Sequence, residues 1–173
     1  MEANTVTSDE NRSEMQIGRG VYTTPNLGGW DEDYGWHCAV FADAQQFEYV
    51  DKAYVPRGLF QRSREDVTPA IWDYISRNFP GVNPAKTLLI SYIEEGPRMQ
   101  MLIPFDLLNA NGGGLQITVE CEDSEEKLRD KIKDEVGEGA EVDYGSWRSL
   151  SGEFSDVESD PGSEEDLRLA NAE

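Results

Sequence analysis

The stretch TLLISYIEEGPRMQMLIPF, residues 87–105, decides the fold that the sequence predicts. Residues 87–93 are almost all apolar or β-branched, which is typical of a strand, and the turn-forming run Glu-Glu-Gly-Pro follows at 94–97. Beyond it, apolar residues occupy every second position, namely Met99, Met101, Ile103 and Phe105. The stretch therefore predicts an antiparallel hairpin, with Pro104, which has no backbone N–H, at a strand end or sheet edge.

A helix is predicted just before the hairpin, over residues 68–79. Thr68 is a suitable N-cap, and Pro69 fits the first helical position. The apolar residues recur every four positions on one face, at Ile71, Ile75 and Phe79. Asp73 and Arg77 are spaced for an ion pair on another face, and a Pro-Gly pair ends the helix.

A strand and a second helix are predicted after the hairpin. Residues 115–121 alternate, so we expect one set to face inward (Leu115, Ile117, Val119 and Cys121) and the other to face outward (Gln116, Thr118 and Glu120). Asp123 and Glu126 are spaced as a capping box, and Gly137 ends the helix. Its apolar stripe consists of Leu128, Ile132 and Val136.

Two short apolar runs precede the first helix. Residues 36–41 predict a buried strand, and residues 47–50 predict its continuation or partner. The order of elements predicts an α+β fold: a mostly antiparallel sheet of about four strands with two helices packed on one face. The other face of such a sheet would be free, with Gln116, Thr118 and Glu120 as a polar platform.

The charge is distributed unevenly along the chain of 173 residues, whose net charge is -20. Residues 36–100 hold 8 acidic and 7 basic residues, whereas residues 101–173 hold 20 and 6. We therefore predict a flexible polar arm over 1–20, a single α+β domain over 21–144, and a disordered acidic tail over 145–173. The overall charge argues against an ordinary basic nucleic-acid binder, but the nearly neutral middle weakens that exclusion.

The chain has no run of 18 apolar residues and no signal-peptide pattern at its start, so we expect no membrane span and an intracellular, cytoplasmic location. Two cysteines, Cys38 and Cys121, cannot form a disulfide framework, and we expect both to be buried and unpaired.

Enzyme chemistry has little support in the sequence. The one histidine, His37, lies beside Cys38, but a buried cysteine is usually a packing residue rather than a nucleophile. One histidine and two distant cysteines do not match a metal site, and the Gly-rich run at 112–114 is not a phosphate loop. We expect no enzyme, no catalytic residue, no metal and no cofactor.

Binding has more support. Basic residues interleaved with aromatic ones can follow a phosphate backbone, and this pattern occurs at Lys52, Arg57, Arg62 and Arg64. The alternative is a loop whose arginines balance nearby carboxylates such as Glu65 and Asp66. Trp30 and Trp36 are candidates for stacking on bases, although Trp36 also opens an apolar run.

Several short blocks resemble the small silencing suppressors of tombusviruses, which clamp short double-stranded RNA as a dimer. The blocks are collinear and lie at Asn26–Gly28, Tyr34–Phe41, Ser76–Phe79 and Gly114–Val119. The chain departs from that family in having no tryptophan in residues 1–25 and Ala42-Asp43 where the family has basic residues.

The resemblance implies a viral suppressor of RNA silencing, in the host cytoplasm, that sequesters short double-stranded RNA as a homodimer. Its RNA contacts would come from Gln116 and Thr118 together with Lys52, Arg57, Arg62 and Arg64, and its dimer interface from Leu128, Ile132 and Val136. The alternative hypothesis is an acidic interaction module, such as an inhibitor or immunity protein, that binds a basic partner protein.

Overall fold

The computed structural model of the chain describes residues 16–27, 35–59, 67–93, 98–108, 113–137, 142, 144, 147 and 149–150. Within them the elements follow in the order β1 (Gly20–Thr23), β2 (His37–Phe41), α1 (Ala44–Tyr49), β3 (Lys52–Tyr54), η2 (Arg57–Leu59), α2 (Thr68–Asn78), η3 (Pro84–Lys86), β4 (Leu88–Tyr92), β5 (Met99–Pro104), η4 (Phe105–Leu107), η5 (Gly113–Leu115), β6 (Thr118–Glu122) and α3 (Glu125–Val136). The η elements are short 3-10 helices. The predicted α+β class is confirmed, and the strand pairs are mostly antiparallel.

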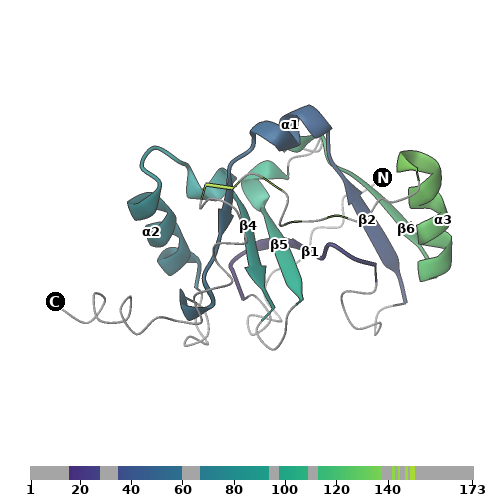
Figure 1. Cartoon of the computed structure of the whole chain (residues 1–173), viewed down its shortest axis with the longest axis horizontal. Coiled ribbons are helices and arrows are strands. Elements are labelled where there is room, and N and C mark those ends of the chain that lie inside the picture. Colours follow the sequence, from purple (N-terminus) through teal and green to yellow (C-terminus); the bar gives the residue numbers. More distant parts are fainter. Residues whose placement is uncertain are drawn as a thin grey trace.

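The larger sheet has four strands in the order β1-β5-β4-β3 (Figure 1). Strands β4 and β5 are the arms of the predicted hairpin and pair antiparallel, with Leu89 opposite Leu102. The predicted turn at 94–97 lies outside the described residues. Strand β3 pairs parallel with β4, because helix α2 provides the long crossover that parallel neighbours need. Strand β5 ends at Pro104. A strand end or sheet edge was predicted for this residue because proline has no backbone N–H to donate to a neighbouring strand.

Strand β1 lies at the edge of this sheet and ties the N-terminal segment to it. Its Gly20 is opposite Pro104, and a Cβ there would lie 2.3 Å from the carbonyl oxygen of Ile103. Just before the strand, Ile17 is fully buried, and the buried Gln100 donates from Nε2 to Gln16 Oε1 at 2.7 Å. The packed region therefore begins before residue 21.

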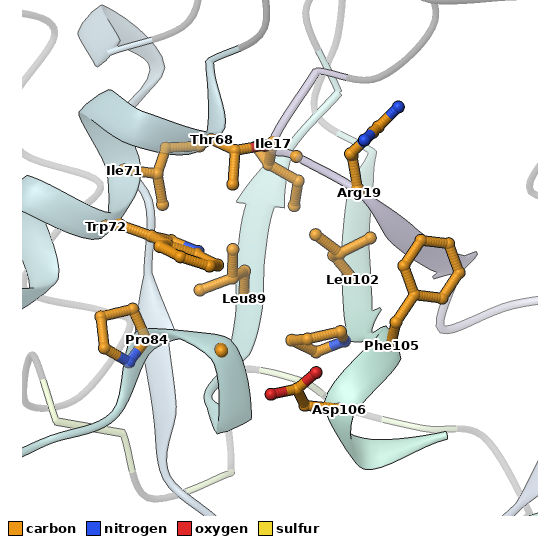
Figure 2. Close-up of a pocket in the computed structure, with 13 residues that line it drawn as sticks. Ile17, Arg19, Thr68, Ile71, Trp72, Pro84, Leu89, Leu102, Phe105 and Asp106 are labelled. Atoms are coloured by element: carbon orange, nitrogen blue, oxygen red, sulfur yellow. The ribbon is translucent and has the colours of Figure 1, made fainter. Parts of the chain in front are cut away.

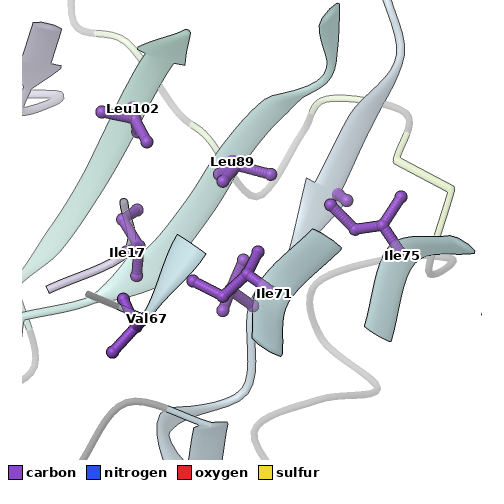
Figure 3. Packing of buried hydrophobic residues seen from close by; sticks show 8 residues of the cluster. Ile17, Val67, Ile71, Ile75, Leu89 and Leu102 are labelled. Carbon is purple, nitrogen blue, oxygen red and sulfur yellow. The ribbon is translucent and has the colours of Figure 1, made fainter. Parts of the chain in front are cut away.

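Helix α2 covers one face of the four-stranded sheet. Its residues Ile71 and Ile75 are fully buried, as the four-residue spacing predicted. They pack in a cluster completed by Ile17, Ala53, Val55, Val67, Leu89 and Leu102 (Figure 3). The predicted ion pair of Asp73 with Arg77 is also present, at 2.7 Å. The N-cap position is held by Val67 rather than by Thr68, without a side-chain bond to the helix.

The opposite face of the same sheet is buried as well. A second cluster consists of Tyr54, Leu88, Ile90, Met101, Ile103, Leu107, Leu115 and Tyr144. Trp147 packs against it, and Leu150 packs against the first cluster while its N–H donates to the carbonyl of Lys52 at 2.7 Å. Packing therefore continues past residue 144, the predicted end of the domain. Residues 1–15 and 151–173, which hold most of the predicted arm and tail, lie outside the described residues.

Residues 47–50 are not a strand, so this prediction is wrong. They belong to helix α1 and its C-terminal end. Asp43 occupies the N-cap, and its Oδ1 accepts a hydrogen bond from the N–H of Gln46 at 2.8 Å. The capping sequence Asp-x-x-Gln thus prevails over the strand preference of Phe47 and Tyr49.

Strands β2 and β6 form a second, two-stranded antiparallel sheet, and helix α3 lies beside it at one end of the molecule (Figure 1). Ser124, just before the helix, is its N-cap rather than Asp123: the Oγ of Ser124 accepts from the N–H of Lys127 at 3.3 Å. The helix ends at Gly137, as predicted, with a positive φ of 87°. The helices are thus divided: α2 covers the four-stranded sheet, whereas α3 covers the two-stranded sheet.

Candidate functional site

The β2–β6–α3 unit is defined as residues 35–41 and 118–137, and α3 covers one face of its two-stranded sheet. Lys131 of α3 binds Glu120 Oε2 at 2.7 Å and Glu122 Oε1 at 3.1 Å, and Leu128 is fully buried. The side chains of Glu120 and Glu122 therefore face the helix. Gln116, Thr118 and Glu120 were predicted to form a free polar platform; the prediction is wrong for Glu120, which is paired with α3, whereas Gln116 and Thr118 are exposed.

The other face of the unit is apolar, and no described residue covers it. Its central pair is Cys38 opposite Cys121, and Val119 follows on the same side of β6. Trp36 lies directly before β2, two positions from Cys38, so the alternation of an extended chain places it on the same side. It is 67% exposed, and Val119 is 53% exposed. We call these four residues the disulfide face. Its inner end reaches the body through Val40 and Ile117, which pack against the second core cluster.

Cys38 and Cys121 form a disulfide across the two strands, so the expectation of unpaired cysteines is wrong. Both residues are exposed rather than turned inward. The alternation over residues 115–121 predicted that Val119 and Cys121 face inward. This was wrong because the strand begins only at Thr118. Gln116 has a φ of 50°, a left-handed conformation that interrupts the alternation between buried Leu115 and the strand. A cysteine pair in a disulfide also has no thiol to act with His37 as a nucleophile.

The exposed surface of the unit is acidic, and ion pairs between its side chains stabilise α3. Lys127 binds Asp123 at 2.6 Å, and Arg129 binds Glu125. The bond with Lys127 lowers the pKa of Asp123, and the bonds to Glu120 and then Glu122 raise the pKa of Lys131. Four further carboxylates of α3 form no ion pair with another described residue: Glu126, Asp130, Asp134 and Glu135. The unit therefore combines an apolar face with excess negative charge.

The residues predicted to contact RNA are not gathered on one surface. Lys52 is buried and donates from Nζ to the carbonyls of Phe47 and of Val50, the latter at 3.1 Å. It thereby caps the C-terminal end of α1, and burial lowers its pKa although Asp51 and Glu48 raise it. The guanidinium of Arg57 lies 4.8 Å from the centre of the Tyr92 ring. Lys52 thus has a structural role in the described fold.

The remaining predicted site residues are distributed as follows. Gln116 and Thr118 are exposed, whereas Arg62, Arg64 and Trp30 lie outside the described residues. The residues predicted for the dimer interface all lie on α3: Leu128 is fully buried, Ile132 is half-buried and Val136 is 56% exposed. Leu128 is therefore not available to a second copy of the chain in this fold.

A protein-family profile matches residues 15–153, which is most of the chain. This chain belongs to the DUF5910 family. The description of DUF5910 is a family of unknown function, so membership assigns no activity. The matched range begins two residues before the buried Ile17 and ends three residues after Leu150, so it coincides with the packed region. Neither the curated proteins nor the solved structures contain a match to this DUF5910 member.

Two further features of the described part of the DUF5910 chain bear on its chemistry. No three side chains of His, Cys, Asp or Glu gather there as a metal ion would need. No helix there is both long enough and apolar enough to cross a bilayer. The sequence did not predict the disulfide face, because two cysteines 83 positions apart give no local signal that they pair. The Gly-rich run before β6 was the one signal that the alternation would be interrupted.

Proposed function

We propose that this protein is a non-enzymatic interaction module that binds a basic partner protein through the disulfide face. The observation that carries the proposal is the exposure of Trp36 and Val119 beside the disulfide, on a sheet face that no described residue covers. Large exposed apolar groups that lie together mark interaction surfaces more often than scattered ones do.

Tryptophan is the residue type most enriched among those that dominate binding energy. A partner with an apolar recess for the indole of Trp36 would remove that ring and Val119 from water together. The disulfide fixes β2, which directly follows Trp36, against β6, which carries Val119, before binding. Fixing the two strands reduces the entropy lost on association.

The charge of the chain favours a basic partner. A net charge of -20, together with the unpaired carboxylates of α3, attracts a cationic surface and speeds the encounter. Positive side chains on such a partner would lie around the apolar contact, opposite residues such as Asp130 and Asp134. This arrangement of an apolar centre within a charged rim is common at protein interfaces.

Silencing suppression by sequestration of short double-stranded RNA, as a homodimer, stays a prediction. It has less support from the geometry, because the ammonium of Lys52 is bonded to backbone carbonyls and the exposed surface of α3 is acidic. Phosphate groups brought against those carboxylates would be repelled. A cytoplasmic location also stays a prediction. The expectation of unpaired cysteines no longer supports it, because Cys38 and Cys121 form a disulfide and disulfides persist mainly in oxidising compartments.

A pull-down from the cells that make the protein tests the proposal. Immobilised wild-type chain is compared with Trp36→Ala and with the matched control Trp72→Ala, a second exposed tryptophan that lies on α2. We expect the wild type and the control to retain the same basic protein and Trp36→Ala to lose at least ten-fold in affinity for it once purified, a loss of about 1.4 kcal/mol or more. Added duplex RNA should not compete.

Two results would contradict the proposal: equal retention by Trp36→Ala, or retention of short duplex RNA in place of a protein. Deletion of residues 151–173 should weaken binding of the basic partner, since these residues carry much of the negative charge. The deletion begins after Leu150 because Trp147 and Leu150 pack against the core.

A further inference from the structure

A second candidate site lies on the α2 side of the four-stranded sheet, with no residue of the β2–β6–α3 unit in its wall. It is a pocket of about 360 Å³ bounded by α2, η3, η4 and the segment before β1 (Figure 2). This volume is within the range of small-molecule sites, about 300–1,000 Å³. The pocket is therefore large enough for a small organic ligand.

The floor of the pocket is apolar and part of the core. Ile17, Ile71, Leu89 and Leu102 line it, and none is more than 2% exposed. These residues belong to the cluster that fixes α2 on the sheet. The floor keeps its shape, because protein cores are closely packed and deform little. The floor of the site is thus formed before any ligand binds.

Two exposed aromatic rings lie on either side of this floor. Trp72 and Phe105 are 44% and 45% exposed, and in Figure 2 they lie on opposite sides with Leu89 and Leu102 between them. They come from different elements, α2 and η4, yet line the same pocket. Aromatic faces attract cations as well as apolar groups.

The charged groups of the pocket distinguish its two ends. Asp106, next to Phe105, lies at one end, and Arg19 lies at the other (Figure 2). Neither forms an ion pair with another described residue. Asp106 follows the aromatic Phe105 directly in η4, and the chain as a whole is strongly negative. This combination favours a positively charged ligand over a negative one.

We propose that this pocket binds a small amphipathic cation, an organic amine with a flat apolar body. The ammonium group pairs with Asp106, near the rings of Trp72 and Phe105. The apolar body lies between the exposed rings of Trp72 and Phe105, above the buried Leu89 and Leu102. This inference does not depend on the disulfide face, because the two sites share no residue.

The probe for this site is phenethylammonium, with 3-phenylpropionate as the matched acid that carries the same ring. Each is titrated into the isotopically labelled full chain, and the indole N–H resonance of Trp72 is followed by NMR. We expect saturable shifts at Trp72 with phenethylammonium, and binding at least five-fold weaker for 3-phenylpropionate. Asp106→Asn should weaken phenethylammonium about five-fold or more, since it removes a charge-assisted bond at an exposed position.

Two further variants make the test specific. Ala85→Leu, at a wall position outside the two core clusters, should fill the pocket and abolish the shifts at Trp72. Arg19→Gln, the matched control at the opposite end, should leave phenethylammonium binding unchanged or tighten it. Equal or tighter binding of 3-phenylpropionate, an unchanged affinity in Asp106→Asn, or the absence of saturable shifts would overturn the proposal.

Discussion

The four-stranded sheet and the β2–β6–α3 unit are stabilised by different means. In the sheet, every residue of β3 and nearly every residue of β4 and β5 is buried, with apolar clusters on both faces. In the unit, neither β2 nor β6 contains a fully buried residue, and α3 buries only Leu128.

A two-stranded sheet is at best marginally stable by itself in water. Here a disulfide and a set of surface ion pairs hold the small sheet and its helix together. Because this arrangement does not require burial of both faces, one face stays available for a partner. The comparison teaches that the weakly packed region is the one free to bind, whereas the well packed region provides the support.

The largest expected effect is in the four-stranded sheet. Ile90→Ala removes a fully buried side chain from β4 and should lower the free energy of unfolding by about 2–5 kcal/mol. The matched change Val119→Ala, on the disulfide face, should alter it by less than about 0.5 kcal/mol. Urea denaturation followed by circular dichroism measures both. Similar losses for the two variants would show that the disulfide face is packed rather than free.

Removal of the disulfide should destabilise the β2–β6–α3 unit. The double variant Cys38→Ala, Cys121→Ala should lower stability by about 2–4 kcal/mol, since the bond closes a long loop in the unfolded chain. Hydrogen exchange should show the loss of protection first in β2, β6 and α3 and last in β4 and β5. Equal loss in all strands would mean that the two regions unfold as one.

A smaller effect is expected at high pH, and it belongs to the four-stranded sheet. Burial raises the pKa of Tyr144 to about 12 although its hydrogen bond with Thr23 lowers it. The neutral phenol is thus favoured in the folded state. Its contribution is fully present below pH 10 and is lost as the pH rises toward 12, by an amount on the order of 2 kcal/mol.

Tyr144→Phe tests this pH dependence. The variant lacks the ionising group, so its stability should fall less steeply between pH 10 and pH 12 than that of the wild type. Denaturant midpoints at successive pH values measure the difference. Parallel curves for the two proteins would show that the pKa of Tyr144 is the same in the folded and the unfolded chain.

The sequence predicted those elements whose signals are local. The alternation around Met101 gave the β4–β5 hairpin, the spacing of Ile71 and Ile75 gave the buried face of α2, and Gly137 gave the end of α3. Helix α1 carried a signal too, Asp43 with Gln46, but aromatic residues in the same stretch favoured a strand.

The features of the candidate site depend on contacts between distant segments, so the sequence did not predict them. Which face of β6 is free depends on the left-handed turn at Gln116, and the pairing of the cysteines depends on the register of β2 with β6. Lys52 was predicted to be a surface charge, yet it is buried because the carbonyls at the end of α1 lie within reach of its ammonium. Trp36 was identified as a candidate for stacking, and its exposure agrees with a contact role.

Site-specific photo-cross-linking in the cells that make the protein tests the central claim most directly. A photoreactive phenylalanine analogue replaces Val119 on the disulfide face or, as the control, Ser76 on the exposed surface of α2. We predict cross-links from position 119 to a basic protein, which Trp36→Ala abolishes, and none to that protein from position 76. No cross-link from position 119, equal cross-links from both positions, or cross-links to RNA alone would contradict the claim that the disulfide face binds a basic protein.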